Sequence, residues 1–163
     1  MRKVVNVPLT ALGISRAIGE VERTKREILR RTEQLVQRLT EEGTEIARVR
    51  ITELDAIYTG DLLASIEGFY DPQSHVGIVR ANSPYAFYVE YGTGIVGAGS
   101  PHPEPDGWVY DINGHGQEGW VYFNGNDQKF HLTRGMRARP FMYNTLERLS
   151  DDCMRIAREV FGA

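Results

Sequence analysis

Three glycines, Gly92, Gly94 and Gly97, have the G-x-G-x-x-G spacing that binds the pyrophosphate of a dinucleotide in many α/β enzymes. That chemistry needs a strand before the glycines and a helix directly after them, because the phosphates bind at the helix N-terminus. Here residues 98–108 (AGSPHPEPDGW) follow, and their three prolines cannot form such a helix. We therefore predict no nicotinamide or flavin cofactor. Residues 92–106 are instead expected to form a long flexible loop.

The histidines offer a second chemistry, that of a metal site. His102, His115 and His131 could be combined with Cys153 or Glu90, but they show none of the close spacings of zinc-binding motifs. We therefore predict solvated histidines and no catalytic metal.

The sequence also does not support nucleophilic or acid–base catalysis. Ser65 and Ser83 lack a glycine elbow and an ordered base nearby, and no two carboxylates form an evident acid–base pair. Cys153 lies on the apolar stripe of a helix and is expected to be a small core residue. The sequence therefore predicts that the protein is not an enzyme.

Charged residues have structural rather than catalytic explanations. Glu90 is the one carboxylate inside an apolar, aromatic stretch, so it needs a partner if it is buried. This partner would be an arginine, with Arg137 and Arg139 as candidates, or backbone donors. Arg134–Arg139 forms a basic patch before the last helix. This patch could contact phosphates without reading a base sequence, or it could pair with carboxylates of another subunit. The second interpretation is favoured because the chain is acidic.

Composition is typical of one globular domain over residues 1–163. Apolar residues make up 41% and charged residues 25%, and the formal net charge is −3. The single cysteine cannot form a disulfide within the chain. No run approaches the roughly 18 consecutive apolar residues of a membrane span, so we expect a soluble protein made in the cytoplasm.

The elements that carry these residues predict an α+β fold. Apolar residues at three-, four- and seven-residue spacings predict a long N-terminal helix from about Ile14 to about Arg50, after an N-terminal arm of residues 1–13. Gly43 either kinks or ends this helix. Either the chain's own sheet or a partner could cover the apolar stripe, and the first is favoured. A second amphipathic helix begins at Pro140.

The centre of the chain predicts a small, mainly antiparallel sheet built from hairpins. Residues 65–70 and 75–81 read as one hairpin, and a short helix from Pro84 ends at Gly92. The GWVY strings at 107–110 and 119–122 are predicted to pair around Asn113-Gly114, and residues 129–133 (KFHLT) could add a further strand.

Three segments in this order resemble the neck or tail-completion proteins of long-tailed bacteriophages and prophages, which join heads to tails. They are TGDLLASI (59–66), SPYAFYVEYGTG (83–94) and RARPFM (137–142). The sequence lacks the proline that commonly precedes the TG of the first segment. The matched family-motif residues, to which the resemblance gives a role in assembly, are Thr59, Gly60, Leu62, Ser65, Ile66, Tyr85, Ala86, Glu90, Gly92, Thr93, Gly94, Arg139, Pro140 and Phe141.

The resemblance implies a non-enzymatic virion protein without a cofactor. It would form a ring of its own copies at the head–tail junction or at the head-proximal end of the tail, with six-fold symmetry favoured over twelve-fold. Its partners would be connector and tail-tube or tail-terminator proteins, with non-specific contact to DNA passing through the channel and no membrane. Two alternatives remain open: a DNA-binding accessory protein that uses the Arg134–Arg139 patch, and an enzyme that uses His102 or Glu90.

Overall fold

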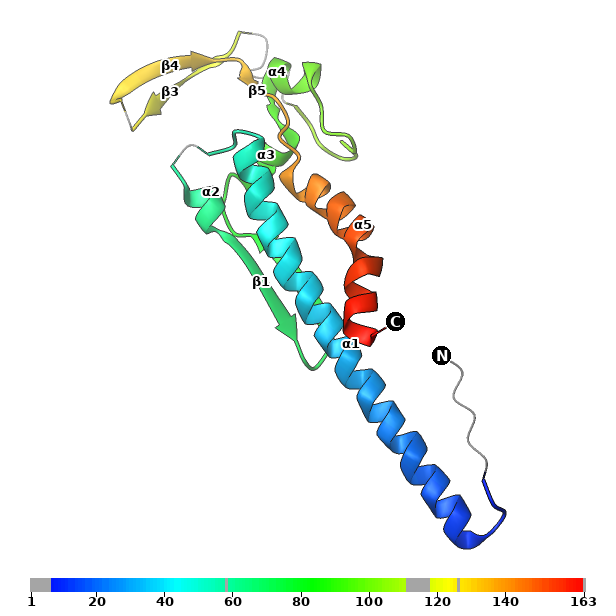
Figure 1. Cartoon of the computed structure of the whole chain (residues 1–163). Helices are drawn as coiled ribbons and strands as arrows, with labels where there is room; N and C mark the ends of the chain where they lie inside the picture. Colours follow the sequence, from blue (N-terminus) through cyan, green and yellow to red (C-terminus); the bar gives the residue numbers. More distant parts are fainter. Residues whose placement is uncertain (1–6, 58, 111–117, 126, 163) are drawn as a thin grey trace.

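The computed structural model describes residues 7–57, 59–110, 118–125 and 127–162 and shows an elongated α+β protein (Figure 1). The predicted fold class is confirmed. The elements are α1 (Ala11–Glu53), α2 (Asp61–Ala64), β1 (Ile66–Asp71), β2 (Val76–Ala81), α3 (Ala86–Tyr91), α4 (Gly94–Gly99), β3 (Trp120–Asn124), β4 (Lys129–Thr133), β5 (Gly135–Met136) and α5 (Phe141–Phe161). The longer strands form two separate two-stranded antiparallel hairpins, β1–β2 and β3–β4.

Helix α1 is a single helix of 43 residues, about 65 Å long at 1.5 Å per residue. It begins earlier than predicted, because the Thr10 side chain accepts a hydrogen bond from the Gly13 amide and caps the first turn. Gly43 neither ends nor interrupts it. A side chain at Gly43 would lie 3.2 Å from both Leu149 of α5 and Val79 of β2, so glycine lets both elements approach the same point of α1.

The Thr10 cap leads to a local prediction. Thr10→Ala should cost the first turn about 1 kcal/mol of helix stability. Because the beginning of α1 projects away from the rest of the protein (Figure 1), this loss should speed amide exchange at Ala11–Ile14 and leave the melting temperature unchanged. Thr24→Ala in the same part of the helix is the matched control and should leave the first turn's exchange rate alone. Equal exchange at Ala11–Ile14 in Thr10→Ala and the parent would contradict the capping role.

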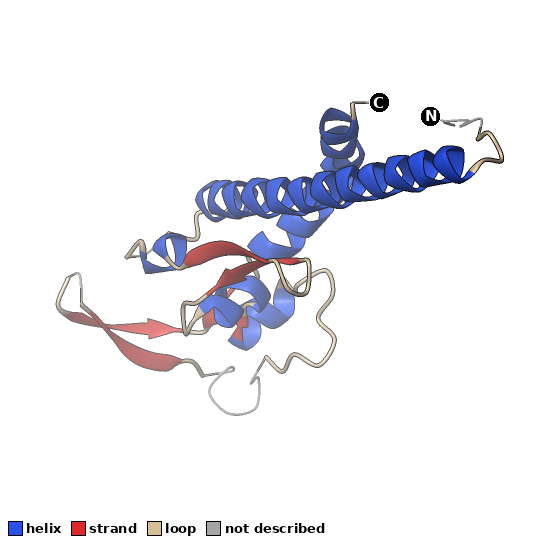
Figure 2. Cartoon of the chain, turned by 90° about the horizontal axis from the view of Figure 1, so that it is seen from below, coloured by secondary structure: helices blue, strands red, loops and turns tan. Residues whose placement is uncertain are grey.

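The β1–β2 hairpin confirms its prediction and packs on one side of the second half of α1 (Figure 2). The register pairs Ile66 with Ala81 and Asp71 with Val76. Two glycines of the hairpin, Gly68 and Gly77, lie directly against α1. A side chain at either position would collide with Thr44 or Thr40 of the helix. The hairpin therefore approaches α1 more closely than larger residues would allow.

Helix α5 also packs along α1 and confirms the predicted C-terminal amphipathic helix. Its first residue, Phe141, and Ile156 near its end are both buried. Cys153 is only partly buried and is not one of the residues of the main hydrophobic core, so its predicted core role is not confirmed. The main hydrophobic core consists of Ala47, Ile51, Ala56, Leu62, Ile66, Ala86, Val89 and Phe141.

Ion pairs fix the last turns of α5 to α1. Glu159 accepts hydrogen bonds from Arg155 at 3.0 Å and forms an ion pair with Arg38 at 2.9 Å. The hydrogen bond from Arg155, followed by that from Arg38, holds the pKa of the Glu159 carboxyl below its ordinary value.

Glu159→Gln should therefore lower the melting temperature slightly at neutral pH. Because the folded-state pKa is depressed, the stabilisation is present above the ordinary carboxyl pKa and is lost as the pH falls through the lower folded-state value. Thermal unfolding of variant and parent across this range should show two curves that converge in acid. A difference that grew towards acid would contradict the assignment, and Glu41→Gln, at an exposed position of α1, provides a control.

The end of the molecule opposite the first turn of α1 (Figure 1) differs from two predictions. Strand β3 pairs with β4, from Trp120↔Thr133 to Asn124↔Lys129, and not with the first GWVY string. Residues 107–110 are not a strand, because Trp108 donates to the Gly92 carbonyl at 3.0 Å and stacks on Tyr91 with ring centroids 5.1 Å apart. The predicted Asn113-Gly114 turn lies outside the described residues. Strand β4 confirms the further strand predicted at KFHLT.

The second correction concerns residues 92–106, which were predicted to form one long loop. Residues Gly94–Gly99 form the short helix α4. Gly92, Gly94 and Gly97 are all buried, since the segment passes close to the chain at Arg134–Ala138. The glycines serve this close backbone approach.

Candidate functional site

The three motif segments meet at one junction between α2, α3, β5 and α5. Tyr85 accepts a hydrogen bond from the Leu62 amide at 3.1 Å, which joins the first segment to the second. The Arg139 amide donates to the Val89 carbonyl at 2.8 Å, which joins the second segment to the third. These two bonds therefore join segments that are far apart in the sequence.

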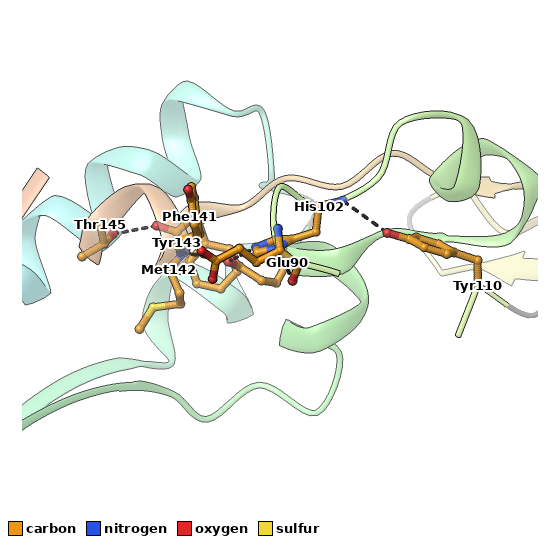
Figure 3. A network of polar contacts seen from close by, with 8 residues as sticks. Glu90, His102, Tyr110, Phe141, Met142, Tyr143 and Thr145 are labelled. Carbon is orange, nitrogen blue, oxygen red and sulfur yellow. Dashed lines mark hydrogen bonds and ion pairs between the residues drawn. The ribbon is translucent and has the colours of Figure 1, made fainter. Parts of the chain in front are cut away.

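Glu90 is the centre of this junction and is only 7% exposed (Figure 3). Its carboxylate accepts hydrogen bonds from the amides of Met142 and Tyr143, both at 2.9 Å. These amides belong to the first turn of α5, which has no side-chain cap of its own because Pro140 precedes it. Glu90 of α3 therefore caps α5, and its negative charge is favourable at a helix N-terminus.

His102 completes the environment of the carboxylate and corrects the prediction of a solvated histidine. It is 4% exposed, and its Nε2 lies 3.1 Å from Glu90 Oε1. Its Nδ1 lies 3.0 Å from the amide nitrogen and 2.9 Å from the carbonyl oxygen of Glu104, so this atom has a hydrogen-bond partner whether it accepts or donates. The ring packs against Tyr91 and Tyr143, with centroids 4.4 Å and 5.3 Å away.

The predicted partners of Glu90 were only half right. Backbone donors are present, but the described hydrogen bonds and ion pairs of Glu90 include neither Arg137 nor Arg139. The Arg139 guanidinium donates instead to the Leu54 carbonyl at 3.2 Å, and Arg137 is exposed. Arg139 thus connects the end of α1 to the start of α5.

Tyr143 extends the junction towards the surface. A hydrogen bond to the Glu147 carboxylate, together with the charge of Glu147, raises the pKa of the Tyr143 phenol. Tyr110 approaches from the other side, where its hydroxyl accepts from the His102 amide at 3.2 Å (Figure 3). No residue spacing indicates His102 or Tyr110 as part of this junction, because both lie in a segment rich in proline and glycine.

The remaining motif residues have structural roles, some local and some between distant parts of the chain. The Thr93 hydroxyl accepts from the Met136 amide at 3.2 Å, and bridges join Thr93 to Met136 and Gly94 to Gly135. Ser65 donates to the Leu62 carbonyl at 2.8 Å. Thr59 and Gly60 precede α2, and the Thr59 hydroxyl donates to Asp61 at 2.6 Å. The residues of the motif that lie in the hydrophobic core are Leu62, Ile66, Ala86 and Phe141.

The basic patch is smaller than the sequence indicates. Of its three arginines, Arg134 and Arg137 are exposed and Arg139 is partly buried in the junction. Within the described ranges, no three His, Cys, Asp or Glu side chains are grouped as a metal site would require. No helix over those same ranges is long and apolar enough to cross a membrane.

Large apolar side chains are exposed at both ends of the molecule. At one end they follow the first half of α1, which projects beyond α5 and the β1–β2 hairpin (Figure 1). At the other end they lie on the projecting β3–β4 hairpin, at Val121, Tyr122, Phe123, Phe130 and Leu132. Exposed apolar surface of this extent is typical of interaction sites.

Comparison of the chain with protein-family models, curated proteins and solved structures finds no match. The functional argument therefore depends on the motif segments and on the surfaces that the fold leaves uncovered.

Proposed function

We propose that this protein is a structural virion component of a tailed bacteriophage. In this proposal, copies of the chain form a ring at the head–tail junction or at the head-proximal end of the tail and are needed to join the two. The resemblance of the three motif segments suggests the family. The observation that carries the proposal is the uncovered apolar surface at both ends of an elongated subunit.

These surfaces favour assembly over catalysis. A ring subunit needs more than one contact surface, and the first half of α1 and the β3–β4 hairpin offer exposed apolar side chains at places far apart on the molecule (Figure 1). Glu90, the best candidate for an acid or base, uses its carboxylate to cap α5 and to hold His102. The buried pair therefore has a structural explanation that needs no substrate.

The partners in this proposal are other copies of the chain, in a ring for which six-fold symmetry is favoured, together with connector and tail-tube or tail-terminator proteins. The competing proposal is a DNA-binding accessory protein that uses Arg134–Arg139. The engagement of Arg139 with Leu54 leaves two exposed arginines in that patch, which is little for phosphate binding.

Deletion of the gene from the phage or prophage that carries it tests the role. We expect lysates with filled heads and finished tails that remain separate, and recovery of joined particles when the intact chain is supplied from a plasmid. Normal joined particles after deletion would overturn the proposal. DNA affinity that falls steeply with salt and is lost in Arg134→Gln with Arg137→Gln would favour the DNA-binding alternative.

A further inference from the structure

The apolar face of α1 that packs on α5 and the β1–β2 hairpin in the second half of the helix continues into the first half, where these elements do not cover it (Figure 1). Leu35 and Leu39 are partly buried, and the same helical face carries Ile14, Ile18, Val21 and Ile28 about two to six turns before Leu35. Cover by α5 ends where the Arg31 guanidinium donates to the Phe161 carbonyl at 2.6 Å. Upstream of this bond, neither α5 nor the β1–β2 hairpin covers α1 (Figure 1). Residues 11–30 of the helix, about 30 Å long, are called the arm from here on, in place of the predicted arm of residues 1–13.

The arm's apolar face is exposed to a degree unusual for such residues. Ile18 and Val21 are 55% and 65% exposed, and the other exposed apolar side chains of the arm are Leu12, Ile14, Ile28 and Leu29. An isolated helix with this pattern gains little from burial within its own chain. The face is therefore suited to packing against another molecule.

Charge is divided between the arm and the rest of the chain. The arm, residues 11–30, carries five basic and three acidic side chains, whereas the rest of the chain carries fourteen basic and nineteen acidic ones. Two arms side by side would bring like charges together. An arm against the acidic remainder of a second copy brings opposite charges together, which favours that arrangement.

The acidic remainder offers an apolar groove between β2, α3 and α5. Its volume is about 630 Å³, and its apolar lining includes Val79, Phe87, Leu146 and Leu149. Two of these lining side chains, Phe87 and Leu146, are 68% and 64% exposed and so are available to another molecule. Charged side chains at the groove include Glu104 and Arg80, and Glu147 lies beside Tyr143 of its lining.

We infer that the arm of one copy docks in this groove of the next copy, with its apolar face against Phe87 and Leu146. This contact joins two unlike surfaces, so it leaves one arm and one groove free at the ends of any open chain of subunits. Repetition with a constant rotation closes a ring or builds a filament. The inference deepens the proposed function by naming the subunit contact.

Two double variants separate the two halves of the contact. Ile18→Asp with Val21→Asp alters the arm, and Phe87→Asp with Leu146→Asp alters the groove. All four positions are exposed, so each variant should keep the parent's circular dichroism. In sedimentation velocity, the full-length parent should form assemblies larger than a dimer, and each variant alone should be monomeric.

An equimolar mixture of the two variants gives the decisive readout. The groove variant still has an intact arm and the arm variant an intact groove, so the mixture should form a one-to-one heterodimer that grows no further. Arg16→Gln with Arg23→Gln changes the charge by the same amount on the opposite face of the arm and should still assemble. If the Arg16→Gln, Arg23→Gln control were monomeric, the loss of assembly in the arm variant would come from its changed charge alone. That result would overturn the apolar contact.

Other results overturn the inference directly. A mixture that stays monomeric, a groove variant that assembles like the parent, or a parent that is monomeric up to about 1 mM would each do so. Loss of duplex-DNA binding in the arm variant, without any self-association of the parent, would make nucleic acid the arm's partner instead. The variant mixture could form heterodimers while the gene-deletion lysate contains normal joined particles. That pair of results would support this contact and contradict only the proposed head–tail role.

Discussion

Replacement of Glu90 by alanine should lower the free energy of unfolding by about 3–5 kcal/mol. The change removes the acceptor of two hydrogen bonds from the first turn of α5 and the partner of His102. The side chains of Glu90 and His102 are both buried. Each buried donor left without an acceptor costs about 1–3 kcal/mol, because it has given up water without a replacement. Denaturation in urea, followed by circular dichroism, measures the loss.

Two further variants make this result specific. Glu90→Gln keeps one acceptor oxygen but directs an amide donor at other donors, so it should lose less than alanine does. Glu104→Ala removes an exposed carboxylate near the same histidine and should change stability by no more than about 0.5 kcal/mol. If Glu90→Ala unfolded at the same urea concentration as Glu104→Ala, the capping role of Glu90 would be wrong.

Replacement of Gly92 by alanine should destabilise the protein by about 3 kcal/mol or prevent folding. Gly92 has φ of +79°, which L-residues rarely adopt, and a side chain there would lie 2.6 Å from the Ala138 nitrogen and 2.8 Å from the Met136 carbonyl oxygen. These are backbone atoms of the chain between β5 and α5, so no side-chain rotation relieves the collision. Thermal unfolding and soluble yield provide the measurement.

Gly99→Ala is the matched control for Gly92→Ala. Gly99 ends α4 in the same segment, its φ is not positive, and a side chain there meets no atom within 4 Å. Its melting temperature should stay near that of the parent. Similar melting of the two variants would contradict the close approach of this segment to Met136–Ala138.

The parts of the fold that depend on local pattern could be predicted from the sequence. The periodicity of α1 and α5 and the alternation and turn of β1–β2 each act within one stretch of chain. The pairing of β3 could not, because β3 had two candidate partners and the choice depends on Trp108, which packs on α3 instead. The short helix α4 was missed because glycine-rich sequence is typical of loops and its burial depends on a distant segment.

The junction around Glu90 shows the same division. A carboxylate in an apolar stretch predicted a buried acceptor, and the structure confirms its burial. The predicted partner was either an arginine or backbone donors, and the structure shows backbone donors. Which amides these are could not be predicted, because every residue except proline carries one and only the fold brings those of Met142 and Tyr143 to Glu90. His102 was missed for a related reason, since only the folded loop brings it beside Glu90.

The most direct test of the proposed role is a cryo-electron microscopy map of the head–tail junction in particles from the phage that encodes this chain. We expect a closed ring in which one copy of the fold fits each repeating unit, with α1 of each subunit reaching the next. Mass spectrometry of the same particles should detect the chain in a small, fixed number of copies. A junction fully accounted for by other proteins, in particles without this chain, would contradict the proposed function.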